Sequence, residues 1–225
     1  TRVATALRRE GARVSGLQLL RLNPAVEHKT RGNAALAVHT DAPPERALET
    51  AVEVVDAAAE VADERTNPGV VVGTEPIEPA VRDFGERAIR EVLDRETAAD
   101  VARAAGYLSE TWKNGRGTIG ALAAIGAGAA LHEPTYEYIA YRAPDRWGTP
   151  REVDRESVFA AADAHYPAAW DTVDRGEGEA VCVPSAPGPI LYGIRGDDPH
   201  AVASLAAEIE SEPIHARALF ETNQG

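Results

Sequence analysis

The chain has 225 residues, a formal net charge of −13 and 44% hydrophobic residues, so it is long enough to bury a core and to form one large domain or two ordinary ones. The chain has 36 acidic residues against 23 Lys+Arg and no methionine, which is typical of an extreme halophile. In such organisms, surface charge keeps a protein soluble at high salt. An ordinary acidic protein from a GC-rich genome is the alternative. A single cysteine excludes an internal disulfide and a multi-cysteine zinc site, and the lack of a long apolar stretch or a signal peptide predicts a cytoplasmic protein that does not enter a membrane.

The first part of the chain alternates predicted helices and strands, which is typical of an α/β domain. The expected elements are a helix over 1–10, strands over 13–24 and 32–41, an amphipathic helix over 43–64, a short buried strand within 67–77, a helical segment with at least one break over 78–106, and a helix over 115–131. The recurring glycines of this last helix, Gly120, Gly126 and Gly128, predict close packing against another helix.

The remainder of the chain has a different order of elements. The expected elements are a strand over 135–142, a helix over 153–173, strands over 178–184 and 190–196, a helix over 198–210 capped by Asp198, and a strand over 214–222. This β-α-β-β-α-β order is the ferredoxin-like split βαβ arrangement. We therefore expect two domains, 1–133 and 134–225.

The chain contains only two lysines, and each lies beside arginine and glycine. Lys29 belongs to "KTRGN" (29–33), which connects two predicted strands. Lys29 and Arg31 supply positive charge, and Gly32 lets backbone amides approach a ligand, which is what a phosphate group requires. A solvated connection with ordinary basic residues is the alternative. Net acidity usually argues against a nucleic-acid partner, but in a halophile it is a background over the whole surface, against which such local basic sites stand out.

The second lysine lies in "KNGRGTIGALAAIG" (113–126), where Gly115 and Gly117 open a predicted helix. The N-terminus of a helix attracts anions through its free amides and dipole, and Lys113 and Arg116 add full charges. The pattern is neither a Walker A loop nor a Rossmann fingerprint, because the lysine precedes the glycines. A tightly packed helix behind a glycine-rich turn is the alternative. We expect the two lysine-containing stretches to form one cationic pocket.

Two weaker signals accompany these motifs. Asn67 and Gly69 form a turn at the edge of a predicted strand, where α/β sites gather, although a plain turn explains them equally well. Tyrosines and tryptophans cluster in the second domain, which usually reflects core packing. A tyrosine together with Arg142, near a strand end, could instead stack on nucleic-acid bases.

Four segments taken in order, "LLRLNPAVEHKTRGNAALAV", "NPGVVV", "NGRGTIGALAAIGA" and "TYEYIAYR", resemble the archaeal tRNA-isoleucine 2-agmatinylcytidine synthetase (TiaS) family. The resemblance covers nearly the whole chain. It implies an enzyme that uses ATP to activate the C2 carbonyl of the wobble cytidine in isoleucine tRNA, after which agmatine displaces the activated oxygen. It also implies a kinase-like catalytic domain followed by a ferredoxin-like domain, an OB-fold and a zinc ribbon.

The resemblance also implies roles for particular residues. Lys29 and Arg31 would act on the reacting base. The residues expected to bind the nucleotide are Thr30, Gly32, Asn33, Asn67, Gly69, Lys113, Asn114, Gly115, Arg116 and Gly117. The family's acidic loop, followed by a Cys-Thr-Thr segment, would hold Mg²⁺ and would precede Thr1, and the OB-fold and zinc ribbon would follow the last residue. The chain is thus expected to be part of a longer protein, with no metal ligands assigned within it.

Two other functions remain open from the residues alone. The first is a small-molecule kinase or phosphotransferase that uses the same anion site without RNA. The second is a non-catalytic RNA-binding or regulatory module. ATP binding separates the two enzymes from the module, and RNA binding separates the tRNA-modifying ligase from the small-molecule enzyme.

Overall fold

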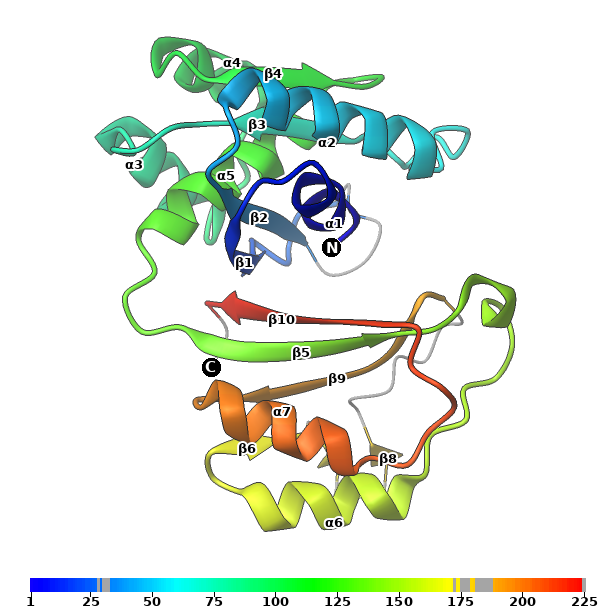
Figure 1. The fold of residues 1–225 in the computed structure, drawn as a ribbon. Helices are drawn as coiled ribbons and strands as arrows, with labels where there is room; N and C mark the ends of the chain where they lie inside the picture. Colours follow the sequence, from blue (N-terminus) through cyan, green and yellow to red (C-terminus); the bar gives the residue numbers. More distant parts are fainter. Residues whose placement is uncertain (28, 30–32, 172, 175–178, 181–187, 224–225) are drawn as a thin grey trace. The chain divides into compact units, whose positions relative to one another are not determined.

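The computed structural model describes residues 1–225 except 28, 30–32, 172, 175–178, 181–187 and 224–225 (Figure 1). The chain divides into two compact units, Thr1–His132 and Glu133–Gly225, and this division falls beside the boundary expected near residue 133. Each unit combines helices with antiparallel strands, which confirms the mixed α/β class. Within the described residues, no helix is both long and apolar enough to cross a bilayer.

The first unit opens with a helix, a strand pair and a second helix. These elements are α1 (Arg2–Arg9), β1 (Val14–Arg21), β2 (Ala34–Thr40) and α2 (Pro44–Ala58). Strands β1 and β2 are antiparallel, with Arg21 opposite Ala34 at one end of the ladder, so the connection that contains "KTRGN" joins their adjacent ends. Helix α2 has proline at its first position, as the sequence predicted, because the missing N–H of proline is not needed there.

The rest of the first unit contains three helices and a short strand pair. These elements are β3 (Gly69–Val72), α3 (Pro79–Ala88), α4 (Arg95–Ala104), β4 (Leu108–Thr111) and α5 (Gly117–Ala129). The predicted break within 78–106 is confirmed, and α4 begins where the Asp94 carboxylate accepts from the Thr97 N–H at 2.8 Å. Strand β4, which pairs antiparallel with β3, was not predicted because three of its four residues are polar and exposed.

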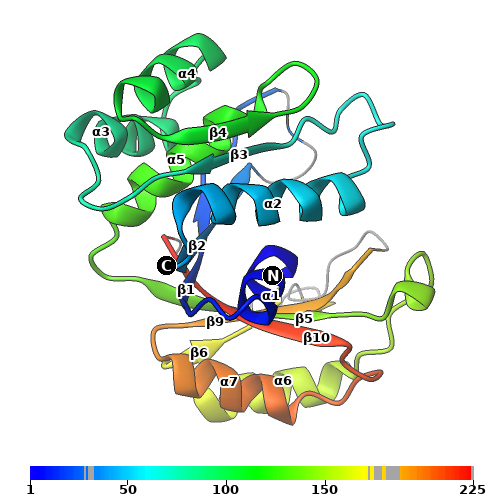
Figure 2. The same cartoon turned by 45° about the horizontal axis from the view of Figure 1, so that its top comes forward.

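Helix α5 lies directly against α3, as both views of the ribbon show (Figures 1 and 2). A Cβ placed on Gly126 would come within 1.9 Å of the Val81 carbonyl oxygen, and one on Gly85 would come within 2.1 Å of the Ala127 nitrogen. Gly120 and Gly128 face Ala35 of β2 and Gln18 of β1 instead, so the predicted close helix packing is confirmed at Gly126. It brings the buried side chains of Val81, Phe84 and Leu122 into one core, which fixes the start of α5 relative to the rest of the unit.

The second unit is a four-stranded antiparallel sheet with helices on one face (Figure 1). Its main elements are β5 (Thr135–Tyr141), the 3₁₀ turn η1 (Pro144–Arg146), α6 (Arg155–His165), β6 (Ala169–Trp170), β9 (Ile190–Gly196), α7 (Pro199–Glu208) and β10 (Ala216–Thr222). The strands lie in the order β10-β5-β9-β6. Apolar residues of the sheet, such as Ile194, pack with Val202 and Leu205 of α7.

One predicted boundary in this unit was wrong. The helix expected to reach residue 173 ends at His165, because Pro167 lacks an N–H and confines Tyr166 to an extended conformation, with φ −62° and ψ 139°. Strand β6, which the sequence did not indicate, follows this proline and pairs with β9. The strand expected over 178–184 is described only in part. Its described part, β8 (Glu179–Ala180), pairs with β7 (Val173–Asp174).

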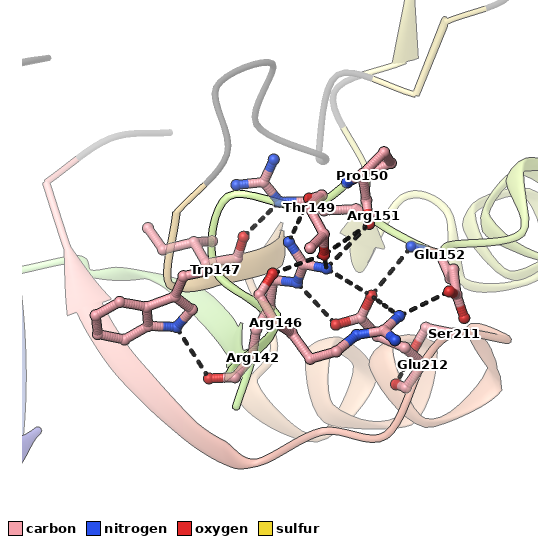
Figure 3. A network of polar contacts seen from close by, with 10 residues as sticks. Arg142, Arg146, Trp147, Thr149, Pro150, Arg151, Glu152, Ser211 and Glu212 are labelled. Carbon is pink, nitrogen blue, oxygen red and sulfur yellow. Dashed lines mark hydrogen bonds and ion pairs between the residues drawn. The ribbon is translucent and has the colours of Figure 1, made fainter. Parts of the chain in front are cut away.

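A buried ion pair organises the loop after β5 (Figure 3). Arg142, 1% exposed, donates to both carboxylate oxygens of Glu212, at 2.7 and 3.0 Å. Its guanidinium also donates to the carbonyls of Thr149 and Pro150 at 2.8 and 3.0 Å. Arg142 therefore links the loop to residue 212 and is not available to stack on bases, so that expectation was wrong.

The acid stability of the second unit should depend on Glu212. The hydrogen bond from Arg142 is the largest cause that lowers the pKa of Glu212 from 4.5 to about 2. Because the folded-state pKa lies below the unfolded value, this carboxylate contributes its stabilisation above pH 4.5 and loses it as the pH falls toward 2. We expect the stability difference between the wild type and Glu212→Gln to shrink by about 3 kcal/mol across that window. Urea unfolding at a series of pH values measures this difference, and a pH-independent difference would contradict the assignment.

Candidate functional site

The glycine-rich loop, residues 112–117, connects β4 to α5 and contacts the turn that precedes β3. The Trp112 N–H donates to the Pro68 carbonyl at 3.2 Å. Gly117 and Gly69 lie so close that a Cβ on Gly117 would come within 2.2 Å of the Gly69 nitrogen. The structure thus brings together two of the groups predicted from the sequence, the turn at Asn67–Gly69 and the glycines 115 and 117. Only glycine permits this backbone approach.

Side chains from separate elements anchor this loop. The Trp112 indole donates to the Asp56 carboxylate of α2 at 2.7 Å, and the Lys113 ammonium donates to the Asp63 carbonyl at 2.7 Å. Lys113 itself has a φ of +57°, the left-handed region that a non-glycine residue adopts at a cost of roughly 1–2 kcal/mol. The ammonium of Lys113 therefore contributes to holding the loop in place.

Arg116 is the exposed cation at the start of α5. Its backbone N–H donates to the Asn114 side-chain oxygen at 3.0 Å. Within the part of the chain that the structure describes, the Arg116 guanidinium makes no ion pair or hydrogen bond. It is thus available to a ligand, beside the first amides of α5.

A cavity of about 590 Å³ lies in the first unit beside this loop, a volume within the range of small-molecule sites. Three of the residues predicted from the sequence line it: Asn33, at the start of β2, and Asn114 and Arg116, from the loop. The other lining residues are Leu22, Val26, Ala88, Glu91, Val92, Leu93, Asp94, Arg95, Ile119 and Gly120. Two stretches about 80 residues apart in the sequence therefore border one cavity.

The wall beside β2 is fixed by two asparagines. The Asn33 amide donates to the Asn23 carbonyl at 2.9 Å, and the Asn23 amide donates to the Arg90 carbonyl at 3.0 Å. The Asn23 N–H also donates to the Ala88 carbonyl at 3.0 Å. The start of β2 is thereby joined to the end of α3, and the cavity has a defined edge at Asn33.

The carboxylates of the cavity already have partners. Glu91 accepts from the Arg87 guanidinium at 3.0 Å, and Asp94 accepts from the N–H and hydroxyl of Thr97 at 2.8 and 2.7 Å. The Thr97 N–H is also the largest cause that lowers the pKa of Asp94. Since both acids have partners, the guanidinium of Arg116 is the group on the polar side of the cavity that can meet an anion, while Leu22, Val26 and Ile119 supply an apolar wall.

Of the other predicted residues, none of those that the structure describes lines the cavity. The Lys29 ammonium is exposed and donates to the Pro24 carbonyl, and neither Lys29 nor Lys113 is a lining residue. Thr30, Arg31 and Gly32 lie outside the described residues. Over the described ranges, no group of three or more His, Cys, Asp or Glu side chains is arranged to hold a metal ion. Sequence reasoning also missed Asn23 and Arg95, because neither lies in the lysine-containing stretches 29–33 and 113–126.

Comparison with known proteins decides the family. A domain profile described as the TiaS TCKD domain matches residues 1–42, and one described as the TiaS FLD domain matches residues 115–225. The chain belongs to the TiaS family. The isoleucine-tRNA 2-agmatinylcytidine synthetase TiaS of Haloquadratum walsbyi is 54% identical over all of this chain and 50% of its own length.

Solved TiaS structures share the fold. The crystal structure of TiaS in complex with isoleucine tRNA and ATP superposes with a TM-score of 0.92 at 38% identity, covering 98% of this chain and 53% of that one. A complex of TiaS with isoleucine tRNA, AMPCPP and agmatine superposes with a TM-score of 0.87 at 37% identity, covering 98% and 54%. The chain therefore spans about half the length of the TiaS proteins that it matches.

Proposed function

We propose that this TiaS chain is part of an ATP-dependent ligase that joins agmatine to C2 of the wobble cytidine of isoleucine tRNA. Family membership supports the reaction, because TiaS relatives have been crystallised with isoleucine tRNA, ATP and agmatine. The observation that carries the proposal is that Asn33, Asn114 and Arg116 border one common cavity. Because the substrate is a tRNA, the proposal also places the protein in the cytoplasm.

Within this proposal, the glycine-rich loop binds the phosphates of ATP. Arg116 supplies a guanidinium, which suits phosphate oxygens, and the amides at the start of α5 add hydrogen-bond donors beside it. Gly115, with a φ of +76°, and Gly117, against Gly69, keep the backbone accessible. The apolar wall then takes the less polar part of the nucleotide, and Asn67 and Gly69 support the loop from behind.

The proposed reaction has two steps, activation of C2 and displacement by agmatine. The C2 carbonyl oxygen of cytidine attacks a phosphorus atom of ATP, which forms a C–O–P linkage, breaks a phosphoanhydride bond and releases the rest of the nucleotide or its phosphates as the leaving group. The amine of agmatine then attacks C2, the phosphorylated oxygen leaves, and the amine loses a proton. Lys29 and Arg31, with Thr30 and Gly32 in the same connection, are proposed to stabilise the charge on the reacting base.

Mg²⁺ belongs to the proposal for the intact protein, because this metal commonly neutralises nucleotide phosphates during phosphoryl transfer. The described residues form no cluster of metal-ligating side chains.

A reconstituted reaction tests the proposed function. The intact protein would be incubated in molar KCl with an isoleucine tRNA transcript, ATP and radiolabelled agmatine. We expect label in the tRNA, and none when ATP is omitted or when the wobble cytidine is replaced by uridine. ATP consumption without tRNA would instead favour a small-molecule kinase, and RNA binding without ATP binding would favour a non-catalytic module.

Replacing Arg116 by alanine should weaken ATP binding by about tenfold or more, because a charge-assisted hydrogen bond to phosphate contributes roughly 1.5–3 kcal/mol. Calorimetric titration of the intact protein with ATP measures the affinity. Arg13→Ala is the matched control, since Arg13 is an arginine of the same unit whose side chain is 80% exposed and lies 3.9 Å from Asp41. Equal ATP affinities for the wild type and Arg116→Ala would count against the loop as the phosphate site.

A further inference from the structure

Arg95, which lies in none of the sequence motifs, forms a hydrogen bond to the part of the glycine-rich loop that lines the cavity. Arg95 is the first residue of α4, and its guanidinium donates to the Asn114 carbonyl at 2.9 Å across 19 positions of sequence. Arg95 and Asn114 both line the cavity. A hydrogen bond from a charged donor to a carbonyl is stronger than one between neutral groups, so this contact can fix the position of the Asn114 peptide.

The segment held by Arg95 is the one that would meet phosphate. Asn114 in turn restrains Arg116, because the Asn114 side-chain oxygen accepts a hydrogen bond from the Arg116 N–H at 3.0 Å. The other two side-chain contacts hold the loop one and two residues earlier. The Trp112 indole bonds to Asp56, and the Lys113 ammonium bonds to the Asp63 carbonyl. Among the described residues, Arg95 is thus the side chain from another element that bonds to the loop at Asn114, immediately before Gly115 and Arg116.

Helix α4 does not need Arg95 to form. Its N-terminus is already capped by Asp94, which accepts from Thr97. Within the described chain, the Asn114 carbonyl is the one group that receives a hydrogen bond from the Arg95 guanidinium. The contact therefore serves the loop and the cavity more directly than the helix.

We propose that Arg95 is a positioning residue of the nucleotide site. It holds the Asn114 peptide so that Arg116 and the first amides of α5 face the phosphates together. This inference rests on the proposed function of the loop as an ATP site. It adds a residue whose importance lies in its effect on the loop backbone and not in a role in the chemical step.

The test compares Arg95→Ala and Arg95→Lys in the intact protein, with Arg103→Ala as the control. Arg103 lies on the same helix and pairs with Asp100 at the surface, with both side chains more than 70% exposed. Steady-state kinetics would give KM for ATP, KM for agmatine and kcat. We expect Arg95→Ala to raise KM for ATP by about tenfold, with KM for agmatine changed less than about twofold.

The lysine variant and the control separate positioning from folding. Arg95→Lys keeps a donor of the right charge and should recover part of the ATP affinity, whereas Arg103→Ala should match the wild type. An unchanged KM for ATP in Arg95→Ala, while the wild type remains active, would overturn the inference and leave the proposed function intact. Equal rises of both KM values, or equal loss in Arg103→Ala, would also overturn it. A wild type without ATP-dependent ligation would overturn the proposed function itself.

Discussion

Replacing Gly126 by alanine is expected to destabilise the first unit by about 3 kcal/mol or more, because the added methyl group overlaps backbone that cannot move independently. The new Cβ would lie 1.9 Å from the Val81 carbonyl oxygen and 2.9 Å from the Val81 carbonyl carbon, both in α3. Relief requires α3 and α5 to separate, which opens the core around Phe84 and Leu122. Hydrogen exchange of the α5 amides in molar KCl measures the loss.

Gly120→Ala is the matched control on the same helix. A Cβ there would meet the Ala35 Cβ at 3.6 Å, an ordinary van der Waals contact, and alanine favours a helix over glycine by about 1 kcal/mol. This variant should therefore be as stable as the wild type or more so. Similar protection of α5 in Gly126→Ala and Gly120→Ala would show that helices α3 and α5 are not in the close contact described.

The elements that sequence predicted well are those whose burial follows their own periodicity. The proline start of helix α2 and the break between α3 and α4 are examples, since a single amphipathic face and local capping determine them. The end of α2 was predicted wrongly, because the helix stops at Ala58 and not at residue 64. Strand β4 escaped prediction because its pairing with β3, and not its polar residues, makes it a strand. Strand β6 escaped because the two-residue segment Ala169–Trp170 is too short to show any alternation.

The residues of the candidate site also fall into two groups, those that a sequence motif indicates and those that only the folded structure reveals. Glycines and cations single out Asn114, Gly115, Arg116 and Gly117 in the sequence as candidates. Residues such as Arg95, Asn23 and Asp56 are ordinary in sequence and acquire their importance only through contacts made by folding.

Lys113 shows that a residue singled out by its motif can make a different contact from the one predicted. Its place in the motif predicted a contact with phosphate, yet its ammonium bonds to the Asp63 carbonyl. A rare residue can be kept in a motif because it holds the loop's conformation. That Lys113 contacts phosphate remains a proposal. The guanidinium of Arg116, which is available to a ligand, is now the stronger candidate for this contact.

The second large effect concerns Glu212. Replacing it by glutamine removes the charge that faces Arg142, whose side chain is 0% exposed, and leaves a buried guanidinium without its counter-ion. Removing one partner of a buried ion pair typically costs about 3–5 kcal/mol. We expect a loss of that order for the second unit, seen as faster hydrogen exchange in β5 and α7.

Two further variants show whether the loss comes from the pair itself. Glu152→Gln removes a carboxylate that is 70% exposed and pairs with Arg146, so it should cost less than about 1 kcal/mol. Arg142→Met combined with Glu212→Gln should cost less than the two single substitutions summed, because residues in one network are not additive. If the two effects simply add, the guanidinium and the carboxylate do not stabilise one another, and the anchor of the loop at 143–152 must be sought in its backbone hydrogen bonds instead.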